Sequence, residues 1–233
     1  MTNLHAPMQQ HKLQNYNSTR GAEAYKADYQ NKLHRKWSDK RERALLHRYF
    51  QKVGHVDAIL DMPCGHGRLS DLLEGHCKRL IEADWSFTMV SLNQQDHGTG
   101  DHGTGEHGTG EHTDQRHYFR ASALEIPLKD QSVDVVVSFR LSHHLETQEL
   151  RERHLRELFR TAKQRVIVTW FSATSLKNML REIRVKIAGK KPKNVLRNQR
   201  VRAIAEECGY VQEEARPLFR IGSGHVLGMF VRR

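Results

Sequence analysis

The segment that decides the fold reads Asp57-Ala-Ile-Leu-Asp-Met-Pro-Cys-Gly-His-Gly-Arg-Leu69. An apolar run ends at Asp61, glycines follow at Gly65 and Gly67, and leucines at helical spacing come after them. This order predicts a strand, a tight turn and a helix. Glycine lets the backbone bend sharply beside a ligand, and the first turn of a helix offers unbonded N–H groups. The segment is therefore typical of the start of a nucleotide-cofactor site, with both glycines on the floor of a pocket.

A second predicted strand, residues 79–84, supplies a carboxylate for the same site. It ends at Asp84, about 20 residues after the turn, where doubly wound sheets place an acid for ribose hydroxyls. A G-x-G turn alone is weak evidence, because many folds need glycine there for steric reasons. The third glycine of the dinucleotide fingerprint is replaced by Ser70, which disfavours a nicotinamide oxidoreductase. We expect Asp84 to bind ribose.

Four segments in order resemble the class I S-adenosylmethionine-dependent methyltransferases. The resemblance is greatest to the ubiquinone/menaquinone C-methyltransferase-like branch (methyltransferase type 11), and it covers roughly residues 55 to 172. The segments are residues 60–67, 83–89, 121–128 and 132–138. The resemblance implies an α/β fold: a Rossmann-like, seven-stranded, mostly parallel sheet with the last strand antiparallel and helices on both faces.

The same resemblance implies S-adenosylmethionine as the cofactor. The two glycines would pass its amino-acid part, Asp61 would lie behind it, and Ser122 with Ala123 would border adenine. The family commonly has an acid where this chain has Ser122, and a hydroxyl contributes a hydrogen bond without charge. The residues expected to bind the cofactor are Asp61, Cys64, Gly65, Gly67, Asp84, Trp85, Ser122 and Ala123.

Candidate catalytic side chains follow the valine-rich strand predicted over residues 133–139. The carboxyl end of such a strand carries His143 and His144 to the rim of the pocket, where open α/β sheets bind ligands. Imidazole exchanges a proton near neutral pH, so His144, or else His143, is expected to act as the base, unless these histidines only cap a helix or pack against the cofactor. Arg140 would bind an anionic substrate or pair with a surface acid. The reaction needs no metal.

Composition bounds the remaining possibilities. The 233 residues suffice for one α/β domain, and neither a signal peptide nor an 18-residue apolar run is evident. Three cysteines without metal spacing favour a reducing compartment, so we expect a cytoplasmic protein. The net charge of +11 is concentrated in basic clusters, but no aromatic-rich readout motif accompanies them. This pattern disfavours nucleic acid as a partner.

The expected organisation is a disordered tail, residues 1–18, followed by a single methyltransferase domain, residues 19–233. Within that domain the His-Gly-Thr-Gly repeat forms a low-complexity loop insertion, residues 96–114, and residues 175–208 form a basic helical lid. Two helices are expected between residues 19 and 50, with Ser38 as the N-cap of the second. Tyr25 on the first is either a cofactor contact or a core aromatic.

The predicted function is methyl transfer from S-adenosylmethionine to a small molecule or a lipid- or quinone-like acceptor. The basic helix 175–188 is a candidate contact for an anionic membrane surface. The alternatives are a non-catalytic methyltransferase-like binding or regulatory protein and an RNA methyltransferase. The sequence leaves the acceptor atom open.

Overall fold

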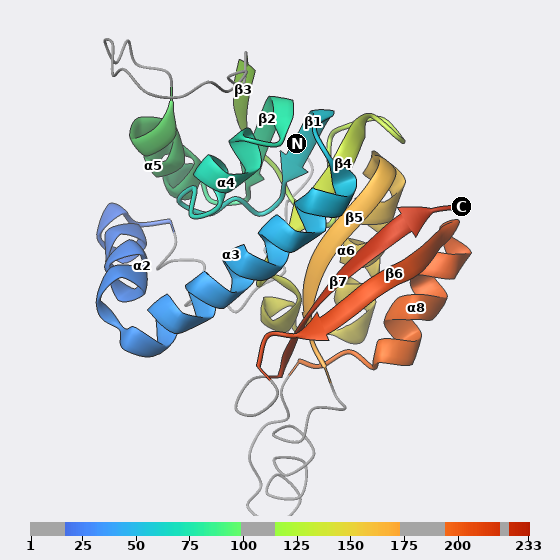
Figure 1. The fold of residues 1–233 in the computed structure, drawn as a ribbon. Coiled ribbons are helices and arrows are strands. Elements are labelled where there is room, and N and C mark those ends of the chain that lie inside the picture. Colours follow the sequence, from blue (N-terminus) through green and yellow to red (C-terminus); the bar gives the residue numbers. More distant parts are fainter. Residues whose placement is uncertain (1–16, 99–114, 173–193, 220–223) are drawn as a thin grey trace, which may run out of the picture.

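The computed structural model describes residues 17–98, 115–172, 194–219 and 224–233. Seven strands form one sheet in the order β3-β2-β1-β4-β5-β7-β6 (Figure 1). They are β1 (Val56–Asp61), β2 (Cys77–Asp84), β3 (Gln115–Arg120), β4 (Val133–Ser138), β5 (Ala162–Phe171), β6 (Tyr210–Pro217) and β7 (His225–Arg232). The first five are parallel, and β7 is antiparallel to both of its neighbours. The predicted Rossmann-like sheet, with its antiparallel last strand, is confirmed.

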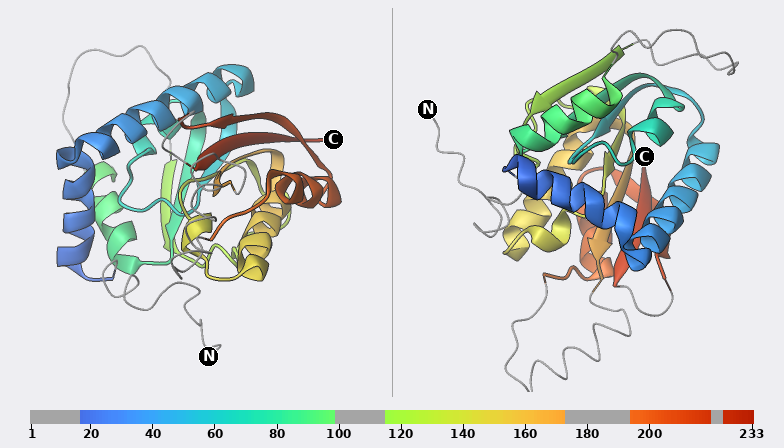
Figure 2. Two further views of the ribbon diagram at one scale, coloured as in Figure 1. Left: turned by 90° about the horizontal axis from the view of Figure 1, so that it is seen from below. Right: turned by 90° about the vertical axis from the view of Figure 1, so that its left-hand side faces the viewer.

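Helices cover both faces of this sheet (Figure 2). They are α2 (Thr19–Asn31), α3 (Leu33–Val53), α4 (Ser70–Glu74), α5 (Phe87–His97), α6 (Gln148–Thr161) and α8 (Asn198–Glu207), with the 3₁₀ turn η1 (Ser142–His144) after β4. One core cluster joins α3 and α4 to the sheet, and a second joins α6 and α8 to the opposite face. Every residue of β4 is buried, as expected for a strand covered on both sides.

The strand order changes direction between β1 and β4. From β1 the chain adds β2 and β3 on one side, and it then crosses to place β4 on the other side of β1. Open α/β sheets bind ligands at such a point, outside the carboxyl ends of the strands. The glycine turn after β1 therefore lies at the expected switch point.

The prediction that Ser38 caps the second helix is wrong. The N-cap of α3 is Lys32, six residues earlier, and no side chain caps the helix. Ser38 lies inside the helix, where its hydroxyl accepts a hydrogen bond from the Arg140 guanidinium at 2.5 Å. Ser38 therefore bonds to a residue 102 positions away in the chain and not to the backbone of its own helix, as a cap would.

Three predicted boundaries also differ. Ser18, placed in the tail, is the N-cap of α2 and accepts a hydrogen bond from the Gly21 N–H at 3.1 Å. Helix α5 continues through His97, so the first residues assigned to the loop insertion are helical. Helix α8, assigned to the lid, buries Val201, Ile204 and Ala205 in the core. Residues 1–16 of the tail, residues 99–114 of the insertion and the basic helix 175–188 lie outside the described residues.

Candidate functional site

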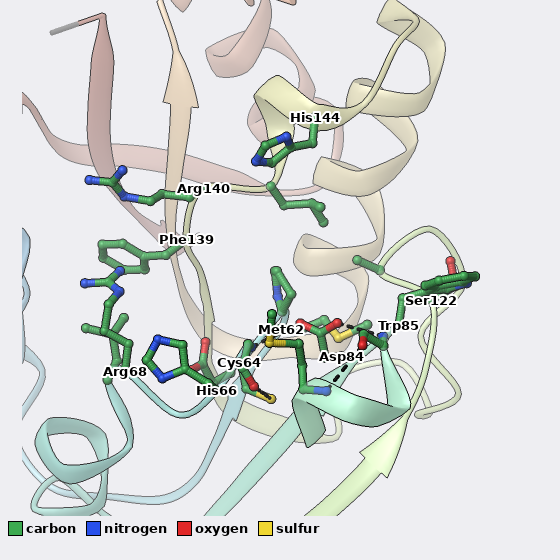
Figure 3. A pocket seen from close by; sticks show the side chains of 18 of the residues that line it. Met62, Cys64, His66, Arg68, Asp84, Trp85, Ser122, Phe139, Arg140 and His144 are labelled. Atoms are coloured by element: carbon green, nitrogen blue, oxygen red, sulfur yellow. Dashed lines mark hydrogen bonds between the residues drawn. The ribbon is translucent and has the colours of Figure 1, made fainter. Parts of the chain in front are cut away.

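A cavity opens at the carboxyl ends of β1, β2 and β4 (Figure 3). It encloses about 1070 Å³, including the part open to solvent. Trp85 and Ser122 lie on one side and Phe139 and Arg140 on the other. The lining residues come from α2, the glycine turn, the end of β2, the loop after β3, and the segment after β4: Tyr25, Asp61, Met62, Pro63, Cys64, Gly65, His66, Arg68, Leu69, Asp84, Trp85, Ser86, Met89, Ser122, Ala123, Leu124, Phe139, Arg140, Leu141, His144 and Leu145.

Asp84 and the glycine turn are joined directly. The Gly65 N–H donates to Asp84 Oδ2 at 3.0 Å, and the Ser86 N–H donates to Oδ1 at 2.8 Å. Burial raises the pKa of the Asp84 carboxyl to about 6, although these backbone N–H groups act in the opposite direction. Each oxygen retains a lone pair, so a ligand hydroxyl can donate to either one.

Asp61 ends β1 beneath the turn and is almost fully buried. Within the described part of the chain its Oδ1 atom has no hydrogen-bond partner. Burial raises the pKa of this carboxyl well above its ordinary value, and the nearby charge of Glu82 raises it further. An unsatisfied buried acceptor in a cavity wall is suited to a cationic or hydrogen-bond-donating ligand.

The glycines of the turn have different roles. Both have positive φ, +58° at Gly65 and +80° at Gly67. A Cβ on Gly65 would meet nothing within 4 Å, whereas one on Gly67 would lie 2.0 Å from Asn93 Oδ1. Gly67 therefore permits close packing against α5 and does not line the cavity, which corrects its predicted place on the pocket floor.

Ser70, at the third glycine position of the dinucleotide fingerprint, belongs to a buried polar network. Its hydroxyl donates to Glu82 Oε1, and the Asn93 side-chain amide donates to the same oxygen at 2.9 Å. This network fixes α4 and α5 against β2 beneath the turn. A serine at this position thus serves packing of the site rather than ligand contact.

The loop after β3 is fixed by side chains of α6. His154 Nδ1 lies 3.1 Å from the Ala123 carbonyl, the Arg153 Nε–H donates to the Leu124 carbonyl at 2.8 Å, and the Ile126 N–H donates to Glu157 at 2.8 Å. His154 Nε2 lies 3.1 Å from the Ser138 hydroxyl at the end of β4. Burial lowers the pKa of His154 to about 4, so the ring is neutral at pH 7 and can donate from Nδ1 while accepting at Nε2.

Arg140 adopts a left-handed backbone, with φ of 59°, and its N–H donates to Thr169 Oγ1 at 2.6 Å. Its guanidinium is held by Glu42 on α3, with Nε donating to Oε1 at 2.7 Å. Arg68 also pairs with Glu42, at 2.9 Å from Oε2. Of the two interpretations for Arg140, pairing with an acid is observed, and that acid is buried rather than on the surface. Both arginines line the cavity, so their pairing with Glu42 shapes its wall.

The two candidate histidines occupy different places. His144 lines the cavity, and His143 does not. The His143 ring lies between His144 and His225, with ring centroids 4.0 and 4.9 Å apart respectively. Of these two histidines, His144 is the one placed to reach a ligand in the cavity.

Several lining residues were given no role from the sequence. His66 lies inside the quoted motif, and burial lowers the pKa of its imidazole to about 4. Tyr25, one of whose two interpretations was a cofactor contact, lines the cavity and packs edge-on against His66. The apolar contributions of Met62, Phe139 and Leu141 follow from their places just after β1 and β4. Position after a strand was the signal that could have identified them.

Comparison with known proteins relates this chain and its fold to methyltransferases. Residues 60–169 match a family model described as a methyltransferase domain. No curated protein sequence matches the chain.

Solved structures are similar in fold. Magnesium protoporphyrin IX methyltransferase from Synechocystis PCC 6803 with bound SAH is 16% identical, with a TM-score of 0.75 over 96% of this chain and 99% of that one. N-methyltransferase NodS from Bradyrhizobium japonicum WM9, in complex with S-adenosyl-l-homocysteine, is 14% identical, with a TM-score of 0.57 over 83% and 86%. A possible histamine N-methyltransferase from Thermotoga maritima is 14% identical, with a TM-score of 0.56 over 92% and 97%. At these identities the likeness concerns the fold.

Residues 60–169 therefore resemble a methyltransferase domain, and the described part of the chain has the fold of the solved S-adenosylmethionine-dependent methyltransferases. The family match, together with the SAM- and SAH-bound structures of the same fold, supports the predictions of an enzyme and of S-adenosylmethionine as its cofactor. The ubiquinone/menaquinone branch stays a prediction.

Proposed function

We propose that the protein transfers a methyl group from S-adenosylmethionine to a small, largely apolar acceptor bound at the end of the cavity formed by the segment after β4. The observation that carries this proposal is one continuous cavity. It joins the Gly65–Asp84 contact at one end to His144 and apolar side chains at the other. A nucleotide-type ligand and an acceptor can thus occupy the same hollow side by side.

The residues around the glycine turn fit the cofactor. Gly65 presents open space where a Cβ would project, Asp84 has acceptor capacity for ribose hydroxyls, and Asp61 Oδ1 is a buried acceptor. Ser122, Ala123 and Trp85 provide a boundary for the adenine ring. When bound, S-adenosylmethionine supplies a methyl group activated by the positive charge on sulfur.

The chain's own contribution is chiefly to hold and align the two reactants. Such alignment can account for about 7–11 kcal/mol of the barrier of a two-reactant step. Phe139, Leu141 and Leu145 form an apolar wall that excludes water from the acceptor end. His144 accepts the proton that a phenol or an activated ring carbon loses.

Arg140 is proposed to contact an anionic group of the acceptor. Its guanidinium already donates to Glu42 and Ser38, so its direction is fixed before any ligand arrives. A quinol, phenol or lipid-like acceptor with an acidic substituent would satisfy both the apolar wall and this arginine. A cytoplasmic location and the absence of a nucleic-acid substrate remain predictions.

Incubation with methyl-labelled S-adenosylmethionine tests the proposal. Panels of quinols, phenols, lipids and tetrapyrrole carboxylates, followed by metabolite extracts, should give a labelled product that is soluble in organic solvent. His144→Ala should abolish most of the labelling. Tight cofactor binding with no labelled product from any extract would favour the non-catalytic alternative, and label in RNA would favour an RNA acceptor.

A further inference from the structure

The amino-terminal half of α3 carries an unusual exposed face. Leu33 and Trp37, one helical turn apart, are 73% and 71% exposed. Lys36, Lys40 and Arg41 follow at helical spacing and are exposed too. Residues spaced by three or four positions share one side of a helix, so these five form one surface, called here the docking face.

Leu33 and Trp37 are exposed, but not because α3 lacks a hydrophobic core to pack against. The opposite side of α3 buries Leu45, Leu46, Tyr49 and Phe50 against the sheet. Leu33 and Trp37 lie before this buried stretch and on the other side of the helix, so no rotation of α3 could bury both sets. Large apolar side chains grouped in this way on a surface usually mark an interaction site.

The charge of the docking face is not neutralised by neighbouring acids. Among the residues that the structure describes, no carboxylate lies within ion-pair distance of Lys36 or Lys40, and Arg41 donates to the Leu218 carbonyl at 3.2 Å. Asp39, on the same helix, instead pairs with Arg43 and Arg68. The face therefore combines two protruding apolar side chains with three positive charges.

The docking face lies on a helix that also supports a residue of the cavity wall. On the inner side of α3, Ser38 and Glu42 hold the guanidinium of Arg140, which lines the cavity. Figure 1 shows that the amino-terminal end of α3 lies beside α2, far from the amino-terminal end of β1. A surface that contacts this face would lie close to the acceptor end of the site.

We propose that the docking face binds the surface of an anionic lipid bilayer. Leucine and tryptophan side chains partition into the headgroup region, and each adjacent lysine or arginine adds attraction to anionic lipid. Two copies of the chain would oppose lysine to lysine, which disfavours a symmetric self-contact. Single-stranded RNA prefers successive aromatic platforms, whereas this face has one tryptophan and a leucine that cannot stack on a base.

Binding of the docking face to a bilayer does not depend on catalysis, so it does not require the proposed methyl transfer. It does give a reason for an apolar acceptor: a lipid-like molecule could pass from the bilayer surface to the nearby cavity. The basic segment 175–188 lies outside the described residues and is not part of the docking face.

Co-sedimentation of the full chain with vesicles tests the proposal. Phosphatidylcholine vesicles with and without phosphatidylglycerol serve as probes, with circular dichroism to verify folding. We expect binding only with phosphatidylglycerol, and weaker binding as salt rises. Lys36→Glu/Lys40→Glu should lower the partition coefficient by about tenfold or more, since four units of charge change at the surface. Leu33→Ser/Trp37→Ser should lower it similarly.

A matched control is Arg79→Glu/Lys129→Glu, which makes the same charge change at exposed residues near the amino-terminal ends of β2 and β4, at the opposite edge of the sheet. This variant should bind nearly as well as the unmodified chain. If both charge-reversal variants weakened vesicle binding equally, net charge alone would explain the effect, and the proposal would be overturned. Binding to an RNA oligonucleotide that depends on Lys36 and Lys40, with no vesicle binding, would also overturn it.

Discussion

Asp84 Oδ2 accepts a hydrogen bond from the Gly65 N–H at 3.0 Å, so the acid that ends β2 is fastened to the bend that leaves β1. The same carboxylate also accepts from the Ser86 N–H at the start of α5. One side chain thereby sets the relative position of two strand ends and a helix. We infer that it can hold the ribose of the cofactor because its surroundings are already arranged without a ligand.

Replacing Asp84 by Asn should weaken binding of S-adenosylmethionine by about tenfold or more, because hydrogen bonds to a charged group contribute roughly 1.5–3 kcal/mol. Thermal-shift titration with S-adenosylhomocysteine measures the change. Asp57→Asn is the matched control, since Asp57 is exposed at the other end of β1 and pairs with Lys78. Equal loss in both variants would contradict a specific role for Asp84.

Cofactor affinity should depend on pH through the same carboxyl. Its pKa is raised to about 6, and ribose hydroxyls donate best to the ionised form, so affinity should fall as the pH drops through 6. The stability of the free protein should change in the opposite direction. A carboxyl whose pKa is higher in the folded chain stabilises the fold at low pH, and that contribution is lost as the pH rises through about 6. Asp84→Asn should remove this carboxyl's contribution to both dependences, which calorimetry at several pH values can measure.

Alanine at the two glycines should have different effects. In Gly67→Ala the new Cβ collides with Asn93, so the free energy of unfolding should fall by about 2 kcal/mol or more. Gly65→Ala has open space and should cost roughly 1–2 kcal/mol for its left-handed backbone, but the methyl group enters the cavity. Chemical denaturation measures the loss of stability in each variant, and cofactor titration measures the loss of affinity. A larger affinity loss in folded Gly67→Ala than in Gly65→Ala would contradict the assignment.

His154 offers a test of how the adenine border is held. Asn at this position retains an amide donor near the place of Nδ1, which faces the Ala123 carbonyl, while Gln places its amide near Nε2, which faces Ser138. Both variants should lose stability, because each leaves a buried partner unsatisfied at about 1–3 kcal/mol. Cofactor affinity should fall about tenfold in His154→Gln and much less in His154→Asn. If the two variants were equally stable and bound the cofactor equally well, His154 would have a role in stability alone.

The fold and half of the site follow from local sequence. A strand, a glycine bend and an acid ending the next strand predicted that Asp84 and the bend belong to one site, since parallel strand ends share one edge of a sheet. The bend glycines were treated alike, however, because their difference depends on Asn93 of α5, whose packing no local pattern reveals.

The acceptor end was less predictable. Arg140 was recognised as charged and near the rim, but its pairing with Glu42 crosses 98 positions of the chain. Serine often precedes a helix, which predicts Ser38 as a cap, but in the structure its hydroxyl contacts Arg140 instead. His143 and His144 are adjacent in sequence, and only the 3₁₀ turn η1 directs one of them toward the cavity.

His144 should act in catalysis rather than in cofactor binding. His144→Ala is expected to lower kcat by about 100-fold or more, in the range of general-base contributions, with cofactor affinity nearly unchanged. His143→Ala is the control, because its ring lies outside the cavity. Labelled methyl transfer to whichever acceptor the extracts yield provides the rates. Equal kcat losses in the two variants would contradict the assignment of the base.

Isothermal titration of the full chain with S-adenosylmethionine at pH 7.5 tests the central claim most directly. The account predicts saturable binding to one site, and strong weakening when Asp84 is changed to Asn. No heat of binding up to millimolar cofactor, or undiminished binding in the Asp84 variant, would contradict it.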